Sequence, residues 1–288
     1  MPSSWVRLAA ALAVAGMIAP VRAAEIAEFQ YVPWSQLSDQ FVTDWGRHAL
    51  GTNAERWKHG ETTHFVIHCF QDGDKIARRS ELFYGEIRDF FGNRRDLLGG
   101  RKSHIFAFND KADWGKFMKL YTLGGLLPNA IGITHGNEFF YLSTGENGQF
   151  DMKGGVQAHE MTHLIFNRFF RSRPPLWLNE GIAEYFGQRK TTTLADFRRQ
   201  MGRTPKFSLN RLFSTDSYPR NPRDADAFYA EAAIVVDFLT MTDERRALLP
   251  KFVDIMIDEN DLAKAVRLYG YQTMTEFESD YKRYRFRF

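Results

Sequence analysis

The chain has 288 residues, of which 44% are hydrophobic and 25% are charged, with a single cysteine. This composition is that of an ordinary globular protein, and it excludes a disordered chain and a small scaffold held by disulfides. The first 23 residues contain two arginines and no acid, so the rest of the chain has 36 basic residues against 35 acidic ones. This even balance gives no basis for a nucleic-acid partner.

The first 23 residues have the pattern of a secretory signal peptide. Arg7 gives a positive start, residues 8–19 are apolar, and small residues precede a cleavage point after Ala23. The apolar run is shorter than the ~20 residues that cross a bilayer, although a retained anchor is the alternative. We therefore expect residues 1–23 to be removed, and the mature protein to be periplasmic or secreted without stable membrane insertion.

Residues 24–60 form a polar lead-in segment with poor periodicity, which we predict to be irregular or partly helical. After it, short apolar runs rich in β-branched residues predict strands, and apolar residues spaced by three and four predict helices. The only cysteine, Cys69, lies in the first of these strands and is interpreted as a buried structural thiol. The predicted order is a strand at 63–70, a helix at 74–91, a strand at 103–108, a helix at 111–120, and strands at 130–134 and 138–143 joined by a turn at 135–137.

From residue 151 onward the pattern is almost entirely helical. We therefore predict an α+β protein in which a small mixed-sheet lobe at 61–190 is followed by a helical C-terminal lobe at 191–288. The predicted helices lie at 154–170, 176–188, 193–201, 224–240, 243–258, 261–268 and 274–285.

The helix predicted at 154–170 contains the sequence His-Glu-x-x-His. Residues four apart share a helix face with Cβ atoms about 5–6 Å apart, so His159 and His163 can both reach one ion. Glu160 is one position further round the helix, where its carboxylate can act on the attacking water rather than on the metal. This pattern is typical of zinc hydrolases. The alternative is a chance match of two surface histidines.

A zinc hydrolase holds its ion with three protein ligands and leaves one position open. The next predicted helix, at 176–188, carries Glu180 and Glu184 one turn apart in mostly apolar sequence. An acid there is costly to bury unless it is paired or bound to a metal. Glu180 can complete a His-His-Glu site, and Glu184 can accept the second N–H of a ligand imidazole. The alternative for Glu184 is a solvated acid on the outer face.

The His-Glu-x-x-His sequence, followed by Trp-Leu-Asn-Glu-Gly at 177–181, resembles the gluzincin zinc metallopeptidases. The likeness is to the small bacterial peptidase-MA-like proteins, and more distantly to aminopeptidase N and thermolysin. It implies a zincin-like fold, one zinc ion per chain on His159, His163 and Glu180, Glu160 as the catalytic base, and a peptide or protein substrate. The Gly-x-Met-Glu-Asn element with which aminopeptidases hold a substrate amino terminus is absent.

Other residues are weaker candidates. Tyr229, in the helix after the metal motifs, is a candidate donor to the oxyanion, as a tyrosine is in aminopeptidase N-like enzymes; the alternative is a ring packed in the core. The run at 138–143 is predicted to be an edge strand able to pair with an extended peptide, with an ordinary packed strand as the alternative. His64 and His68 share a strand face without a carboxylate motif, and we interpret them as structural or surface residues.

The leading hypothesis is zinc-dependent hydrolysis of peptide bonds by an exported gluzincin-type metallopeptidase. A second enzyme hypothesis keeps the zinc site but assigns peptidoglycan cross-links as the substrate. A third is an exported, non-catalytic binding domain that retains a metal site. The intact Glu160 argues against the third, because zinc binding alone needs no base.

Overall fold

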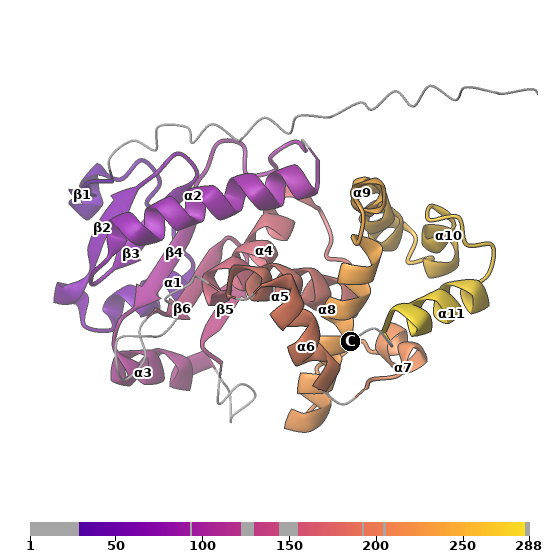
Figure 1. Cartoon of the computed structure of the whole chain (residues 1–288). Coiled ribbons are helices and arrows are strands. Elements are labelled where there is room, and N and C mark those ends of the chain that lie inside the picture. Colours follow the sequence, from indigo (N-terminus) through magenta and orange to yellow (C-terminus); the bar gives the residue numbers. More distant parts are fainter. Residues whose placement is uncertain are drawn as a thin grey trace, which may run out of the picture.

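A computed structural model describes residues 29–92, 94–121, 130–143, 155–191, 193–203 and 206–285, so the predicted signal peptide lies outside the described residues. The architecture combines a six-stranded mixed sheet with helices, which confirms the predicted α+β class (Figure 1). The helical C-terminal part lies beside the sheet-containing part. Among the helices of the described part of the chain, none has both the length and the apolar character that crossing a bilayer requires.

The strands of the sheet follow the order β1-β2-β3-β4-β6-β5. Its centre is parallel, because β4 pairs in parallel with β3 on one side and with β6 on the other. The outer pairs, β1 with β2, β2 with β3, and β5 with β6, are antiparallel. The strands are β1 (Tyr31–Val32), β2 (Lys58–Glu61), β3 (Phe65–Cys69), β4 (Ser103–Phe108), β5 (Gly132–His135) and β6 (Glu138–Leu142).

The prediction that residues 138–143 form an edge strand is wrong. β6 is an interior strand between β4 and β5, and all of its residues are buried. A two-residue turn at Gly136-Asn137 leads from β5 into β6, and Gly136 takes a positive φ of 58° that glycine tolerates readily. The sequence of β6 is apolar on both faces, as suits a strand covered on both sides. The edge strand on this side of the sheet is therefore β5.

The lead-in segment contributes strands to the sheet, which its sequence did not predict. It contains the expected helical part as α1 (Asp44–Gly51), but it also supplies β1 and β2. The sequence of β2, Lys-His-Gly-Glu, has no apolar alternation and therefore gives no strand signal. Its conformation is fixed by antiparallel pairing with the buried strand β3.

Helices cover both faces of the sheet. On one face, Phe65 and Ile67 of β3 pack in a large core with α2 (Gly73–Phe90) and α4 (Gly155–Phe169). Cys69 lies in the same core and is fully buried, as expected, and burial raises the pKa of its thiol to about 12. On the other face, side chains of β4 and β6 pack against aromatic residues of the lead-in and of α3 (Lys111–Tyr121).

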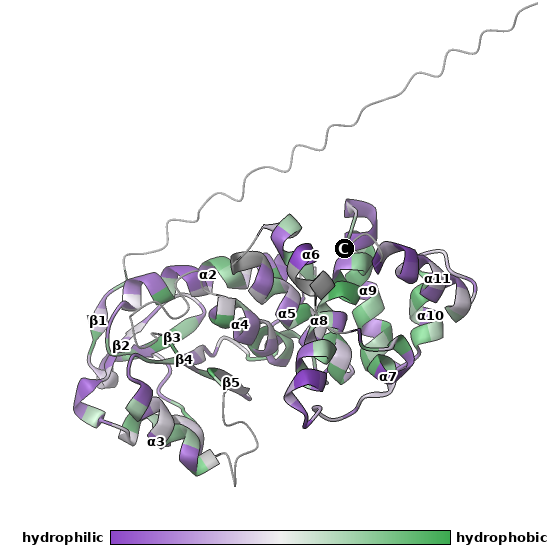
Figure 2. Ribbon diagram, turned by 60° about the horizontal axis from the view of Figure 1, so that its bottom comes forward, coloured by the Kyte–Doolittle hydropathy of each residue, from purple (hydrophilic) through white to green (hydrophobic). Residues whose placement is uncertain are grey.

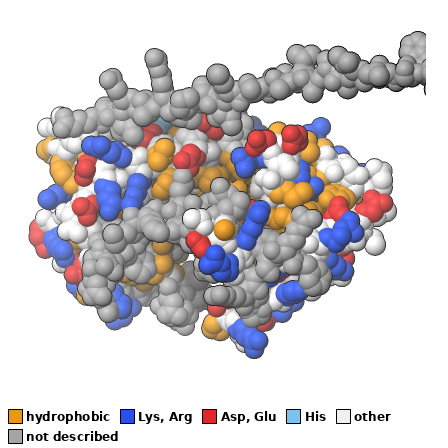
Figure 3. Space-filling model, viewed as in Figure 1, with side chains coloured by type: hydrophobic (Ala, Val, Ile, Leu, Met, Phe, Trp, Pro, Cys, Tyr) orange, Lys and Arg blue, Asp and Glu red, His pale blue; other side chains and the backbone are white. Residues whose placement is uncertain are grey.

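The C-terminal part is helical, as predicted, with α5 packed against both α4 and α8. In Figure 2 hydrophobic residues are concentrated around α8 and α9, where the helices meet. Acidic and basic side chains are interspersed over the described part of the face drawn in Figure 3. The helices are α5 (Leu176–Thr191), α6 (Leu194–Arg203), α7 (Leu209–Ser214), α8 (Pro222–Leu239), α9 (Asp243–Asp258), α10 (Leu262–Arg267) and α11 (Met274–Arg285), of which only α7 was not predicted.

Candidate metal centre

Two packed helices bring the predicted ligands together. α4 carries His159 and His163 on one face, because they are four residues apart. Pro175 immediately precedes α5, where a proline favours the start of a helix, and α5 places Glu180 opposite the histidines. Glu180 is only 2% exposed, and no lysine or arginine is paired with it among the described residues. The possible ion-pair partners of Glu180 among the described residues are the two imidazoles.

The three predicted ligand atoms form a nearly equilateral triangle. His159 Nε2 lies 3.2 Å from His163 Nε2, and Glu180 Oε2 lies 3.6 and 3.5 Å from these two nitrogens. Ligands bound at 2.0–2.1 Å around a tetrahedral ion lie about 3.4 Å from one another. Within the described residues, this is the only group of three or more His, Cys, Asp or Glu side chains close enough to hold one ion.

The opposite nitrogen of each imidazole has its own acceptor. His159 Nδ1 lies 3.2 Å from Glu184 Oε2, and His163 Nδ1 lies 3.3 Å from Asn179 Oδ1. An imidazole that donates from Nδ1 leaves the lone pair of Nε2 free for a metal. Glu184 therefore lies where the sequence predicted, against a ligand imidazole and not on the outer face of α5.

Asn179 is a residue of this candidate site that the sequence reasoning missed. Its side chain is buried, and it contacts two predicted ligands at once: Oδ1 accepts from His163, while Nδ2 donates to Glu180 Oε1 at 3.2 Å. The available signal was its place beside Glu180 in the Trp-Leu-Asn-Glu-Gly sequence. Asn179 thereby fixes the orientation of His163 and of one carboxylate oxygen.

The electrostatics of the site favour a cation between these groups. Burial alone would lower the pKa of His159, but hydrogen bonds to Glu180 and Glu184 outweigh it and hold that pKa well above its ordinary value. Burial likewise opposes ionisation of Glu180, yet the neighbouring His163 and His159 hold its pKa well below the usual range. A buried set of two imidazole nitrogens and one carboxylate oxygen is a donor set that fits zinc.

Two tyrosines face the same carboxylates. Tyr218, on the connection between α7 and α8, donates its hydroxyl to Glu180 Oε1 at 2.8 Å and was not predicted. Tyr229, on α8, has a pKa raised by burial and by the charges of Glu180, Glu184 and Glu160. Its ring also packs against Phe228, with centroids 5.6 Å apart. The two interpretations of Tyr229 are therefore compatible, because the ring packs while the hydroxyl lies near the carboxylates.

Glu160 lies on the side of α4 that faces the edge strand β5. Its side chain is 8% exposed, and Thr134 of β5 donates a hydrogen bond to its Oε2 atom at 2.7 Å. The carboxylate is therefore held from the sheet side, whereas the predicted ligand Glu180 accepts a hydrogen bond from Tyr218 on the connection between α7 and α8. The structure thus separates the predicted base from the predicted ligand set.

The histidines interpreted as structural lie elsewhere. His64 is bonded to Glu81 at 2.7 Å and stacks on Tyr84. His68 is fully buried on the other face of the sheet, between His59 and His104. Neither belongs to the group that could hold a metal ion among the described residues.

Comparison of the chain with models of known protein families gave no match, and comparison with curated proteins gave no significant relative.

Proposed function

We propose that this protein is an exported, zinc-dependent metallopeptidase of the gluzincin type with a zincin-like fold in its sheet-containing part. The observation that carries the proposal is the triangle of the half-buried His159 and the buried His163 and Glu180, whose edges of 3.2 to 3.6 Å suit a tetrahedral ion. The adjacent Glu160 adds the base that a hydrolase needs and a purely structural zinc site does not.

The roles of the side chains follow from their partners. His159, His163 and Glu180 would hold the ion, which when bound lowers the pKa of a water molecule and polarises the scissile carbonyl. Glu160 takes the proton of the attacking water and passes it to the leaving amine. Tyr229 donates a hydrogen bond to the oxyanion; its hydroxyl has no hydrogen-bond partner among the described residues, whereas that of Tyr218 is bonded to Glu180.

An extended peptide can pair with the edge strand β5. His135 and Glu138 flank the two-residue turn, and Leu142 N donates to Ile131 O at 2.9 Å. Because ladder bonds alternate along an antiparallel pair, the N–H and C=O groups of Gly132 and Thr134 point away from β6. No strand of the described residues pairs with these groups, which form the edge of the sheet next to Glu160, where a substrate backbone can add as a further strand.

The proposal is tested by metal analysis of the purified mature protein together with digestion of a mixed peptide library. We expect about one zinc per chain and cleavage that disappears in Glu160→Gln. Cleavage of peptidoglycan cross-links without cleavage of library peptides would transfer the activity to the second hypothesis. A zinc-loaded parent that hydrolyses neither would support the non-catalytic binding domain and overturn the proposal.

A further inference from the structure

Thr134 makes the contact that holds Glu160. Its Oγ1 atom lies 2.7 Å from Glu160 Oε2 and 3.2 Å from the backbone oxygen of the same residue. The shorter contact runs to the carboxylate, and hydrogen bonds to an ionised acceptor are about twice as strong as neutral ones. Thr134 lies 26 positions before Glu160 in the sequence, on another element. It is therefore the sheet, and not the helix alone, that orients this side chain.

Gly132 confines the same carboxylate from a second direction. A Cβ atom at this position would lie only 2.8 Å from both Cγ and Oε1 of Glu160, closer than such atoms pack. The backbone of β5 therefore lies directly against the side chain of Glu160. Gly132 and Thr134 are two residues apart and share one face of the strand. One leaves room for Glu160, and the other holds its Oε2 atom.

The same two residues lie on the outer strand of the sheet, with which no further strand of the described residues pairs. Their N–H and C=O groups point away from β6, while their side-chain positions face Glu160. A backbone that pairs with β5 would thus bond to the strand segment that sets the position of the base.

We propose that Thr134 is a positioning residue for Glu160, acting through its hydroxyl, so that β5 aligns the base with a peptide bound along its edge. The inference rests on the proposed peptidase function. It assigns Thr134 no contact with the reacting atoms, because it acts on the carboxylate alone. Substrate pairing uses the backbone of Thr134, and orientation of the base uses its side chain, so the two roles can be separated by substitution.

Thr134→Val is the decisive variant. Valine has the same shape and is also β-branched, so the strand and its outward amides should persist. We expect kcat to fall about 10- to 100-fold, since misplacing a reacting group by about 1 Å can cost that much. KM and zinc content should stay within about twofold of the parent, because neither depends on the hydroxyl.

Two further variants keep this result interpretable. Thr134→Ser retains the hydroxyl and should return kcat to within about threefold of the parent. Ile133→Val is the matched control, because Ile133 is partly buried and packs against the core on the other face of the sheet. It should leave kcat unchanged. The inference is overturned if Thr134→Val retains the parental kcat, or if Thr134→Ser is as slow as Thr134→Val.

A structural measurement separates this inference from the proposed function. Crystal structures of the zinc-loaded parent and of Thr134→Val should differ in the side-chain conformation of Glu160, which should leave its single position when the hydroxyl is removed. A parent without hydrolytic activity would refute the peptidase while leaving this readout intact. An unchanged Glu160 conformation in Thr134→Val would refute the positioning role even in an active enzyme.

Discussion

Two groups of histidines on opposite faces of the sheet have opposite electrostatic character. On the face covered by α4, His159 and His163 lie among carboxylates. On the other face, the half-buried His59 and the buried His68 and His104 contact one another: His59 Nδ1 lies 2.9 Å from His68 Nδ1, and His68 Nε2 lies 3.0 Å from His104 Nδ1. The same residue type thus lies between carboxylates in one group and mainly against other imidazole rings in the other.

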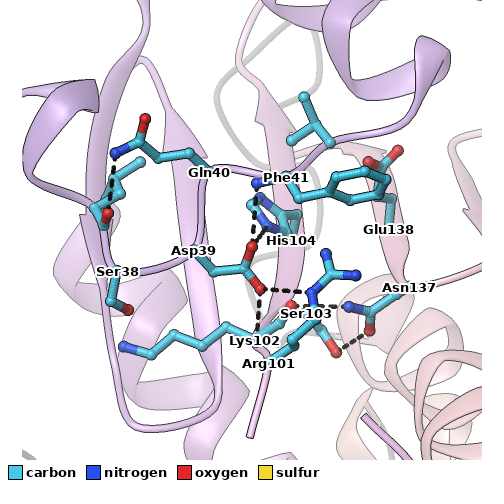
Figure 4. Close-up of polar contacts among 12 residues, drawn as sticks. Ser38, Asp39, Gln40, Phe41, Arg101, Lys102, Ser103, His104, Asn137 and Glu138 are labelled. Carbon is cyan, nitrogen blue, oxygen red and sulfur yellow. Dashed lines mark hydrogen bonds and ion pairs between the residues drawn. The ribbon is translucent and has the colours of Figure 1, made fainter. Parts of the chain in front are cut away.

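The row of histidines across β2, β3 and β4 is held in its neutral form. Burial, together with His104 and His59, holds the pKa of His68 well below its usual range. Burial also lowers the pKa of His104 to about 4, although Asp39 opposes the shift. Asp39 lies 3.8 Å from His104 Nε2 and accepts shorter bonds from Arg101 and the backbone of Lys102 (Figure 4).

The comparison teaches that neighbours decide what a buried histidine can do. Carboxylates beside His159 raise its pKa and favour a positive charge, which a metal ion can replace. Rings beside His68 occupy both of its nitrogens and leave none for an ion. The spacing of two histidines does not by itself identify a metal site. His64 and His68 are also four residues apart, but His68 lies on strand β3 and His64 directly precedes it.

The sharpest test of the α4 site separates its base from its ligand. Glu160→Gln should lower kcat by about 10²- to 10⁴-fold, because the variant has no proton acceptor at this position. It should still bind zinc, because Gln is nearly isosteric with Glu. Glu180→Ala should lose zinc and activity together, since two histidines are too few for a stable site. Zinc stoichiometry and peptide cleavage would be measured for both. If Glu160→Gln lost zinc as readily as Glu180→Ala, the roles would be wrongly assigned.

Removal of the metal should affect stability through the α4 site alone. Zinc present at 1,000 times its Kd stabilises a folded protein by about 4 kcal/mol. A chelator should therefore lower the Tm of the parent clearly, and leave that of Glu180→Ala almost unchanged. His68→Gln should keep the full chelator effect if the two histidine groups are independent. Thermal melts with and without chelator measure all three proteins, and equal shifts in the parent and Glu180→Ala would contradict the site.

The two tyrosines near Glu180 should differ in what they control. Tyr229→Phe should lower kcat about 100-fold at unchanged zinc content, which is the usual effect of removing one oxyanion donor. Tyr218→Phe removes the bond to the ligand Glu180, so it should weaken zinc retention more than turnover of the loaded protein. Kinetics at saturating zinc and zinc titration distinguish the two. Parental turnover in Tyr229→Phe would leave that tyrosine with packing alone.

The neutral row should make the metal-free protein sensitive to acid. Above pH 6.5 these histidines are neutral in both the folded and the unfolded chain and contribute nothing to the pH dependence. Below pH 6.5 these histidines bind protons in the unfolded chain but remain neutral in the folded chain. The free energy of unfolding therefore falls by about 1.4 kcal/mol for each buried histidine with each unit by which the pH is lowered. For His104 this loss continues until the pH approaches its folded pKa of about 4.

Urea unfolding at pH 7, 6 and 5 measures this slope, and His104→Gln should make it shallower by the share of one histidine. Below pH 6.5 His159 does not add to it, because with its raised pKa it is then protonated in both states; between pH 7 and 6.5 it acts in the opposite direction, because the folded chain binds its proton first. If the free energy of unfolding changed equally with pH in His104→Gln and in the parent, protonation of the histidine row would not be the cause of the acid sensitivity.

Much of the fold followed from local periodicity. The helices at 243–258 and 274–285 were predicted with the bounds that α9 and α11 have, because helical periodicity and helix ends depend on residues that are close together in the sequence. The pairing of His159 with His163 was predictable for the same reason, since residues four apart on a helix share a face in any tertiary context. Sequence also placed Glu180 and Glu184 one turn apart on the next helix.

Other features of the site and the sheet could be known only from the tertiary structure, because they depend on contacts between residues that are far apart in the sequence. Tyr218 reaches Glu180 across 38 positions, and Thr134 reaches Glu160 across 26. The interior place of β6, the pairing of β2 and the row from His59 to His104 likewise depend on which strands lie side by side. A strand's own sequence specifies its apolar faces but not its neighbours, because inter-strand hydrogen bonds form between segments whose separation no local pattern records.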